Sequence, residues 1–572
     1  MSSSISTRSA VTIAAVTVVG GLIAYAAYFD YKRRNDAQFR KKLRKEKKRV
    51  ERTRPDVLTP GGGSRSTEEI KEALQMIRNE QLPAGAEEKE QYFMENVQIG
   101  EQLCTQGPAF EIPAALAFYR ALRVYPSPVE LIMIYQKTVP ESVFKIVMEM
   151  TSLDVKQRAE GYYDKFPETS FNVSVEQVPL NDPQIADGKP IKKSVLVASK
   201  DFAPGDVIYK ETPIVMALDV DIESKGTHCS QCFREVSELV FKLPSDALSP
   251  TYCSKECELE ASAQHHALLF GSTPPVIADA AKDIAADPSK VEARKAAQQK
   301  LVDSVRATGK VGLLLVARFI ARMVGDETKK LSTASAGGSA SDDYSLFDHI
   351  ERLRYLEVVD ADCVADEAIL AEVLKLSADG LEEFLRNGRY GMLLGKMAYN
   401  AIGVTYSGGR DDKPESSLRI EEQEWTRTPE GTKKQIGSGL YFVSSYMSHS
   451  CSPNVGPSFP SGTNELHLVA NSTIKKGDQL TMAYVDVKGV PDAGDVENRR
   501  TRRQELARGW RFACACARCQ AEAPVATATQ AAPKEDVHVE GPGAQVEEAV
   551  QRFETGEAGP ELRSKAEADD VE

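Results

Sequence analysis

The sequence is poor in cysteine, with ten among 572 residues. That density excludes a secreted domain held together by disulfide bonds, because such domains are small and rich in cysteine. Eight of the ten lie in short motifs instead of being spread along the chain. Clustered cysteines in a sparse background are typical of metal sites in a protein from a reducing compartment.

The sequence also lacks a general excess of basic charge. Its net charge is −13, which argues against a general nucleic-acid-binding protein. The charge is unevenly distributed: residues 32–54 hold thirteen Lys or Arg against three Asp or Glu, whereas residues 521–572 hold four against thirteen. The hydrophobic share of 42% and the charged share of 27% are ordinary for a globular chain and exclude disorder throughout. The length allows up to about four domains.

One twenty-residue span, Ala10–Phe29, contains no charged residue. As a helix it would be about 30 Å long, which matches the hydrocarbon core of a bilayer. The positive charge follows this span, whereas a cleaved secretory signal carries its charge before a shorter apolar core. We therefore predict a single-pass membrane anchor over residues 1–31, with the rest of the chain in the cytosol. Residues 32–66 would form a basic segment and linker, for which anionic lipid head groups are a better partner than nucleic acid.

Residues 67–170 have a helical pattern with regularly placed helix breakers. The spacing of apolar residues between 114 and 126 is typical of the second helix of a tetratricopeptide unit. The segment Leu131–Tyr135 is apolar on nearly every side, so it must be covered on one face by its own domain and on another by something else. A small helical core would explain the periodicity alone. A more specific interpretation is that these helices form a groove that binds an amphipathic helix.

Several motifs follow the anchor in a fixed order: Tyr92-Phe93-Met94, Gln98–Gly107, Thr138-Val139-Pro140 and Val143-Phe144. This order and spacing resemble the presequence receptor of TOM, the translocase of the outer mitochondrial membrane. The resemblance implies an outer-membrane protein that recognises presequences of mitochondrial precursor proteins and acts with other subunits of the TOM complex. It implies that Gly100 permits close helix packing. It also implies a presequence groove lined by Phe93, Met94, Val97, Ile134 and Tyr135.

The first cysteine cluster combines Cys229-x2-Cys232 with Cys253-x3-Cys257. Two short pairs deliver four thiolates, the number that zinc needs for a tetrahedral site. The second cluster, Cys514-x-Cys516-x2-Cys519, offers three ligands and needs a fourth from elsewhere in the sequence. Cys104 and Cys363 are left over, and we interpret them as ordinary small core residues.

Further motifs accompany these cysteines: the segment Ser448–Asn454, which reads SHSCSPN, a strand-like segment that contains Tyr484, and Trp510-Arg511-Phe512. Together they resemble SET-domain proteins of the SET-and-MYND type, which are protein-lysine methyltransferases that use S-adenosylmethionine. The resemblance implies that Tyr484 is the catalytic tyrosine and that Asn400, His449 and Phe512 border the cofactor. It also implies about two zinc ions, one held by Cys229, Cys232, Cys253 and Cys257 and the other by Cys451, Cys514, Cys516 and Cys519.

The sequence departs from that family at several positions. Lys193 and Val195 replace two glycines before the first strand, and their side chains should obstruct the cofactor. Ser448 replaces an Asn and so loses an amide donor and acceptor. His265 and His266 lack the Cys that follows in the family, and we interpret them as surface residues. These departures predict cofactor binding weakened by about a hundredfold or more.

The expected fold is multi-domain, with the anchor, an all-α tetratricopeptide-like receptor domain over residues 67–170, and an α+β SET domain over residues 190–520. The SET domain should combine small β-sheets with a zinc-binding insert, a helical region and a second zinc-binding segment, over residues 226–270, 271–395 and 510–520. Residues 521–572 should form an acidic, disordered tail. We expect an import receptor of the mitochondrial outer membrane with a SET module whose activity the sequence leaves open. The alternatives are a membrane-tethered protein-lysine methyltransferase and a SET module kept only for binding.

Overall fold

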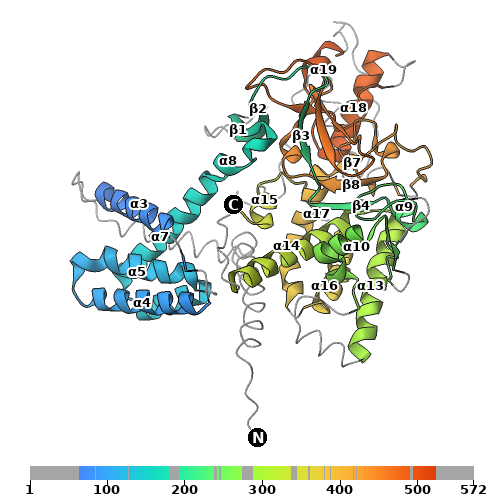
Figure 1. The fold of residues 1–572 in the computed structure, drawn as a ribbon. Coiled ribbons are helices and arrows are strands. Elements are labelled where there is room, and N and C mark those ends of the chain that lie inside the picture. Colours follow the sequence, from blue (N-terminus) through green and yellow to red (C-terminus); the bar gives the residue numbers. More distant parts are fainter. Residues whose placement is uncertain are drawn as a thin grey trace, which may run out of the picture.

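The computed structural model describes residues 63–523 apart from short internal segments, of which the longest are 180–191, 273–287 and 336–343. The predicted anchor, the basic segment and the tail from residue 524 onward lie outside the described residues. Among the residues that the structure describes, no helix is long and apolar enough to cross a membrane. Figure 1 shows two lobes joined by the helices α7 (Glu141–Glu160) and α8 (Tyr162–Lys165).

The first lobe is helical. It contains α3 (Gly63–Asn79), α4 (Ala86–Cys104), the short 3-10 helix η1 (Pro108–Phe110), α5 (Glu111–Val124), α6 (Pro128–Thr138) and the first part of α7. Helix α5 is central because it packs against α3, α4, α6 and α7. Phe118 and Leu122 of α5 are buried with Leu74 of α3 and Met150 of α7. Helix α3 begins inside the segment that the sequence suggested as a linker.

The close helix packing predicted at Gly100 is confirmed. Gly100 of α4 faces the ring of Phe118 of α5, and a Cβ built at Gly100 would lie only 2.8 Å from Phe118 Cζ. Because any side chain at this position would collide with the ring, glycine is what lets α4 and α5 approach each other here. The tetratricopeptide-like arrangement of the lobe stays a prediction.

The second lobe is α+β, as expected. Its strands are β1 (Val173–Pro179), β2 (Lys192–Ala198), β3 (Val207–Glu211), β4 (Val215–Leu218), β5 (Phe241–Lys242), β6 (Thr251–Tyr252), β7 (Ile402–Val404), β8 (Gly437–Leu440), β9 (Ser448–His449), β10 (Val455–Ser458), β11 (Leu466–Ala470) and β12 (Thr481–Met482). Its helices are α9 (Val220–Lys225), α10 (Lys255–Ala261), α11 (Ala267–Leu269), α13 (Pro288–Thr308), α14 (Gly312–Ser335), α15 (Leu346–Glu351), α16 (Ala361–Lys375), α17 (Arg389–Asn400), α18 (Asp495–Trp510) and α19 (Ala517–Ala521).

Strand pairing brings distant parts of the sequence together. Strands β1 and β2 form an antiparallel pair, so β structure begins before residue 190. In the two larger sheets, β3 pairs with β11, which pairs with β10, and β4 pairs with β8, which pairs with β7. Strands β9 and β12 pair in parallel, with His449 beside Met482. This pairing places Tyr484, two residues after β12, next to His449.

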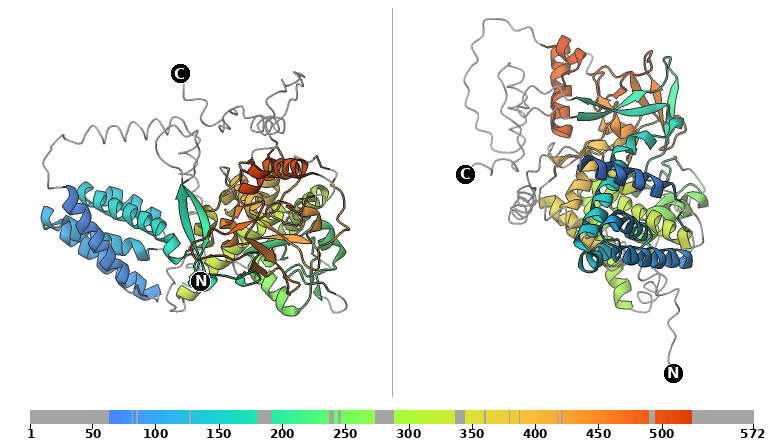
Figure 2. Two further views of the ribbon diagram at one scale, coloured as in Figure 1. Left: turned by 90° about the horizontal axis from the view of Figure 1, so that it is seen from above. Right: turned by 90° about the vertical axis from the view of Figure 1, so that its left-hand side faces the viewer.

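In the view of Figure 1, α13, α14, α16 and α17 lie in the lower part of the second lobe, whereas α18 and α19 lie at its top. Residues 313–321 of α14 are all buried, and its Arg318 donates a hydrogen bond to the backbone oxygen of Met216 on β4. The π-helical turn η3 (Ser262–His266), between α10 and α11, packs against α14 and ties the segment that carries the first cysteine cluster to the helical region. Figure 2 shows the two lobes from two further directions and confirms that they lie side by side.

Candidate functional sites

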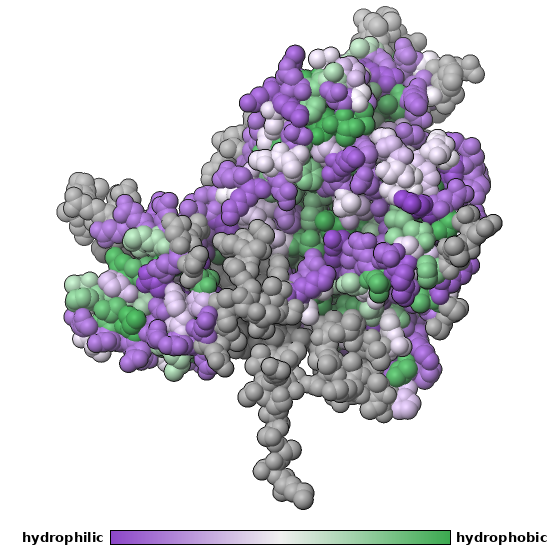
Figure 3. All heavy atoms as spheres, in the orientation of Figure 1, coloured by the Kyte–Doolittle hydropathy of each residue, from purple (hydrophilic) through white to green (hydrophobic). Residues whose placement is uncertain are grey.

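The helical lobe exposes apolar side chains on α4 and α6, which both pack against α5. Met94 of α4 is 61% exposed, and Ile134 of α6 is 48% exposed. Phe93 and Val97, also on α4, are half-buried, and the ring of Phe93 lies 5.0 Å from that of Tyr125. Figure 3 shows apolar surface on this lobe among polar surroundings. These four expected groove residues are therefore available, wholly or partly, to a bound apolar chain.

Tyr135, the fifth residue expected in the groove, lies in the core and is 3% exposed. Its ring packs 5.0 Å from that of Phe118, and its hydroxyl donates a hydrogen bond of 3.3 Å to the backbone oxygen of Phe118. Met133 is exposed on the same helix but was not singled out from the sequence. The sequence did indicate that this helix exposes an apolar face, because Leu131–Tyr135 is apolar on nearly every side. In the structure Leu131 and Tyr135 face inward, while Met133 and Ile134 face outward.

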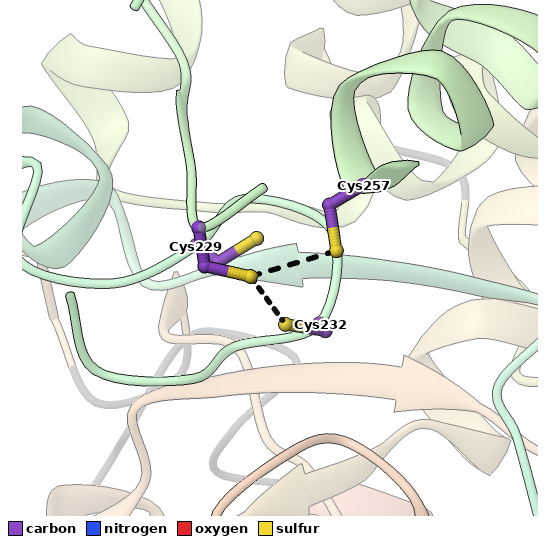
Figure 4. Close-up of side chains that lie close together, drawn as sticks. Cys229, Cys232 and Cys257 are labelled. Carbon is purple, nitrogen blue, oxygen red and sulfur yellow. Dashed lines mark hydrogen bonds between the residues drawn. The ribbon is translucent and has the colours of Figure 1, made fainter. Parts of the chain in front are cut away.

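The first cysteine cluster has the geometry of a zinc site. Atoms Sγ of Cys229, Cys232, Cys253 and Cys257 all lie within 4.8 Å of one another. The Sγ atoms of Cys232 and Cys257 are each 3.6 Å from that of Cys253, close to the ~3.8 Å between sulfurs of a tetrahedral zinc site. Figure 4 shows side chains of this cluster turned toward one another. A hydrogen bond with Cys232 lowers the pKa of the Cys229 thiol, which favours its thiolate form.

The second cluster draws its ligands from three segments. Cys451 follows β9, Cys514 and Cys516 follow α18, and Cys519 lies on α19; their sulfur atoms all lie within 4.8 Å of one another. Cys451 thus supplies the fourth ligand that the local motif lacks. Arg518 donates a 3.0 Å hydrogen bond to the backbone oxygen of Cys451, and Arg499 donates one of 2.7 Å to that of Cys519. Both clusters therefore have the donors, spacing and backbone support to hold zinc.

Tyr484, in the second lobe, is buried. Its backbone N–H donates to Nδ1 of His449 at 3.1 Å, and its hydroxyl donates to the backbone oxygen of Met447 at 2.6 Å. The rings of Phe512 and Trp510 lie 6.4 and 5.3 Å from its own. Burial raises the pKa of Tyr484 to about 12, so it carries its proton at neutral pH. The structure thus brings together Tyr484, His449 and Phe512, as expected.

Asn400, at the end of α17, is fully buried beside this centre. Its Nδ2 donates to the backbone oxygens of Arg354 and Lys396, at 2.7 and 2.8 Å. Its Oδ1 accepts a 2.9 Å hydrogen bond from Nη2 of Arg427. Arg427 belongs to no motif, so the sequence did not indicate a role for it. In the structure its Cζ lies 4.3 Å from the centre of the Tyr484 ring.

The residues that replace the family's glycines lie on β2. Val195 is fully buried, and Lys193 is half-buried. Loss of solvent lowers the pKa of the Lys193 ammonium to about 8. The hydroxyl of Ser448 is buried and has no hydrogen-bond partner among the described residues. An Asn at position 448 would bring an amide to this place, which agrees with the loss of hydrogen bonding expected from the sequence.

His265 and His266 are buried, which corrects the expectation that they lie on the surface. Atom Nε2 of His266 lies 2.7 Å from Oδ2 of Asp246. Burial, together with the charges of Arg318 and His266, holds the pKa of His265 well below its usual range. The imidazole of His265 is therefore neutral and packs as a core side chain.

Comparison with known proteins separates the chain into the same two parts. The family model described as MAS20 protein import receptor matches residues 12–164, and the SET domain model matches residues 194–485. The N-terminal part is 42% identical to the mitochondrial import receptor subunit tom20 of Neurospora crassa over 143 residues, which are 25% of this chain and 78% of that protein. It is 36% identical to the subunit TOM20 of Saccharomyces cerevisiae over 144 residues, again 25% of this chain and 78% of that protein.

The second part is similar to methyltransferases, either over a short segment or at a lower sequence identity. It is 36% identical over 87 residues to the human protein-lysine N-trimethyltransferase SMYD5. That match covers 15% of this chain and 20% of the human protein.

Proposed function

Because the chain belongs to the MAS20 protein import receptor family in its N-terminal part and carries a SET domain in the rest, we propose that it is an import receptor of the mitochondrial outer membrane. It recognises amphipathic presequences of cytosolic precursor proteins and delivers them to the other subunits of the TOM complex. The attached SET module would sit in the cytosol beside the receptor. Residues 1–31, which lie outside the described part, would anchor the chain.

The observation that carries this proposal is the exposed apolar surface of the helical lobe. Met94 and Ile134 expose apolar side chains where the receptor resemblance expects the groove, and Phe93 and Val97 adjoin Met94 on the same helix. A presequence helix would place its apolar face against these side chains and keep its basic face in water. Tyr135 would support the groove from beneath through its packing on Phe118.

Import into isolated mitochondria tests this role. Mitochondria that contain this chain as their presequence receptor should import a presequence-bearing precursor, and Ile134→Asp should slow that import. Import of a precursor without a presequence should be unchanged by the same substitution. Protease added to the intact organelles should remove the SET lobe, since the chain after the anchor faces the cytosol. Protection of the SET lobe, or equal effects on both precursors, would contradict the proposal.

A second candidate function is methyl transfer to protein lysines by the membrane-tethered SET lobe. Burial of Tyr484 against His449 and Phe512 favours it, as does the second cysteine cluster beside them. Lys193, Val195 and Ser448 weigh against it. Incubation of the full chain with labelled methyl donor and a mitochondrial outer-membrane fraction decides the matter. Transfer that Tyr484→Phe abolishes would support this function, and absence of transfer would leave the SET lobe as a binding module.

A further inference from the structure

A buried cation occupies the centre of the SET lobe. Arg427 is 0% exposed, and its guanidinium lies over the face of the Tyr484 ring. Its hydrogen bonds go to neutral oxygens: Nε donates to the backbone of Tyr399 at 2.9 Å, Nη1 to the backbone of Ser445 at 3.0 Å, and Nη2 to Oδ1 of Asn400 at 2.9 Å. A ring face and converging carbonyl oxygens are the surroundings that recognise a positive charge.

The backbone around Arg427 fixes it in this position. Its N–H donates to the oxygen of Ala401 at 2.9 Å, and its own oxygen accepts from the N–H of Gly403 at 3.2 Å. The next residue, Thr428, donates from its N–H to the backbone oxygen of Tyr484 at 3.1 Å. The segment thus lies between β7 and the chain that carries Tyr484. Arg427 is part of the core and not the end of a mobile surface loop.

A second cation acts on the same centre. Arg354 acts electrostatically on Arg427, on Tyr484 and on Lys193 of β2. Two cations therefore act on Tyr484, and Arg427 is the one whose guanidinium lies over its ring.

The cofactor implied by the SET resemblance is itself a cation at its reactive end. S-adenosylmethionine carries a positive sulfonium, whereas S-adenosylhomocysteine has a neutral sulfide in its place. As the side chains lie, both N–H groups of the Asn400 amide are donated, its oxygen accepts from Arg427, and Arg427 covers one face of the Tyr484 ring. The residues present therefore do not fit the sulfonium cofactor.

We propose that Arg427 is an internal cation that excludes S-adenosylmethionine from this SET lobe, by filling the cation position on Tyr484 and by repelling a second positive charge there. Two like charges a few ångströms apart in a buried site repel strongly because little water screens them. The exclusion is selective: it acts on the sulfonium and spares the neutral sulfide. This inference is independent of the receptor function proposed above.

Calorimetric titration of the full chain in detergent tests the proposal, with S-adenosylmethionine and S-adenosylhomocysteine as probes. The unaltered protein should bind the sulfonium compound no more tightly than the sulfide. Arg427→Met, which keeps much of the side-chain volume without its charge, should raise the affinity for S-adenosylmethionine at least tenfold relative to that for S-adenosylhomocysteine. Arg427→Lys keeps the charge and should preserve the exclusion. Arg386→Met, at an exposed position, is the matched control.

Zinc content and thermal unfolding show whether each variant is folded. A preference of the unaltered protein for S-adenosylmethionine of more than tenfold would overturn the proposal, and this comparison needs no variant. Arg427→Met would also overturn it by changing neither affinity, or by raising both equally, since the second result would indicate obstruction by volume and not by charge.

Discussion

The hydroxyl of Tyr162, at the start of α8, lies 2.5 Å from Nδ1 of His349 on α15. This contact joins the last helices of the receptor lobe to the SET lobe. Arg352 lies over the ring of Tyr162 at 4.0 Å, and the hydroxyl of the neighbouring Tyr163 lies 3.2 Å from Oγ of Ser194 on β2. Helices α7 and α8 therefore connect the proposed presequence groove to the strand that carries Lys193 and Val195.

The first prediction concerns this junction. Tyr162→Phe removes the hydroxyl and leaves Nδ1 of the half-buried His349 without that partner. The free energy of unfolding should fall by about 1 kcal/mol, the usual net contribution of one hydrogen bond. Urea denaturation of the full chain measures the change. Tyr355→Phe, at an exposed position, should have almost no effect. Equal effects of both substitutions would mean that the junction adds no stability.

Metal content provides the second prediction. We expect about two zinc ions per chain, with Cys253→Ser removing one and Cys516→Ser removing the other. Binding of a structural zinc ion contributes on the order of 10 kcal/mol to folding, so each loss should also lower the unfolding temperature. Cys104→Ser and Cys363→Ser change thiols outside both clusters and should retain both ions. Mass spectrometry of the native protein gives the count, and a value near zero would contradict both sites.

A third prediction follows from Glu211 at the end of β3. Its buried carboxylate accepts hydrogen bonds from the backbone N–H groups of Val443 and Ser444 and from the Ser444 hydroxyl. Burial raises the pKa of Glu211 from 4.5 to about 7. Below pH 4.5 the group is protonated in both the folded and the unfolded chain, so its contribution to stability is complete there. Between pH 4.5 and 7 the unfolded chain loses the proton first, so stability falls as the pH rises.

The size of this effect is up to about 3 kcal/mol, since each unit of pKa corresponds to 1.36 kcal/mol. Urea denaturation between pH 5.5 and 7.5 should show part of this decline, because the range spans the raised pKa of Glu211. Glu211→Gln should be less stable overall, since its amide cannot accept every one of those hydrogen bonds. Its stability should nevertheless vary less with pH than that of the unaltered protein. An identical slope in both proteins would show that Glu211 is not responsible.

Features that depend on residues close together in the sequence could be predicted from the sequence. Gly100 was predicted to permit close helix packing, and it does. The paired cysteines implied convergent ligands, and their sulfur atoms do converge. These predictions worked because the relevant residues act through short spacings or through one close approach.

Burial that depends on contacts between distant parts of the chain could not be predicted from the sequence. His265 and His266 were expected on the surface, but Asp246 and Arg318 come from other segments and surround them in the core. Arg427 lies in no motif, and its partners come from the end of α17 and from the segment before β9. Charge alone suggests an exposed position for an arginine. Its burial becomes evident only when the fold places carbonyl oxygens and the Tyr484 ring around it.

The most direct test of the receptor function is the affinity of the full chain for a presequence peptide. The probe is a fluorescent amphipathic helix with a leucine-rich face and a basic face, and its binding is followed by anisotropy. Ile134→Asp should weaken binding at least fivefold, about 1 kcal/mol, because the new carboxylate would lose water beneath the apolar face. Val155→Asp, at an exposed β-branched residue on the far part of α7, should leave the affinity unchanged. Unchanged binding by the Ile134 variant, or an equal loss in both variants, would contradict presequence recognition at this surface.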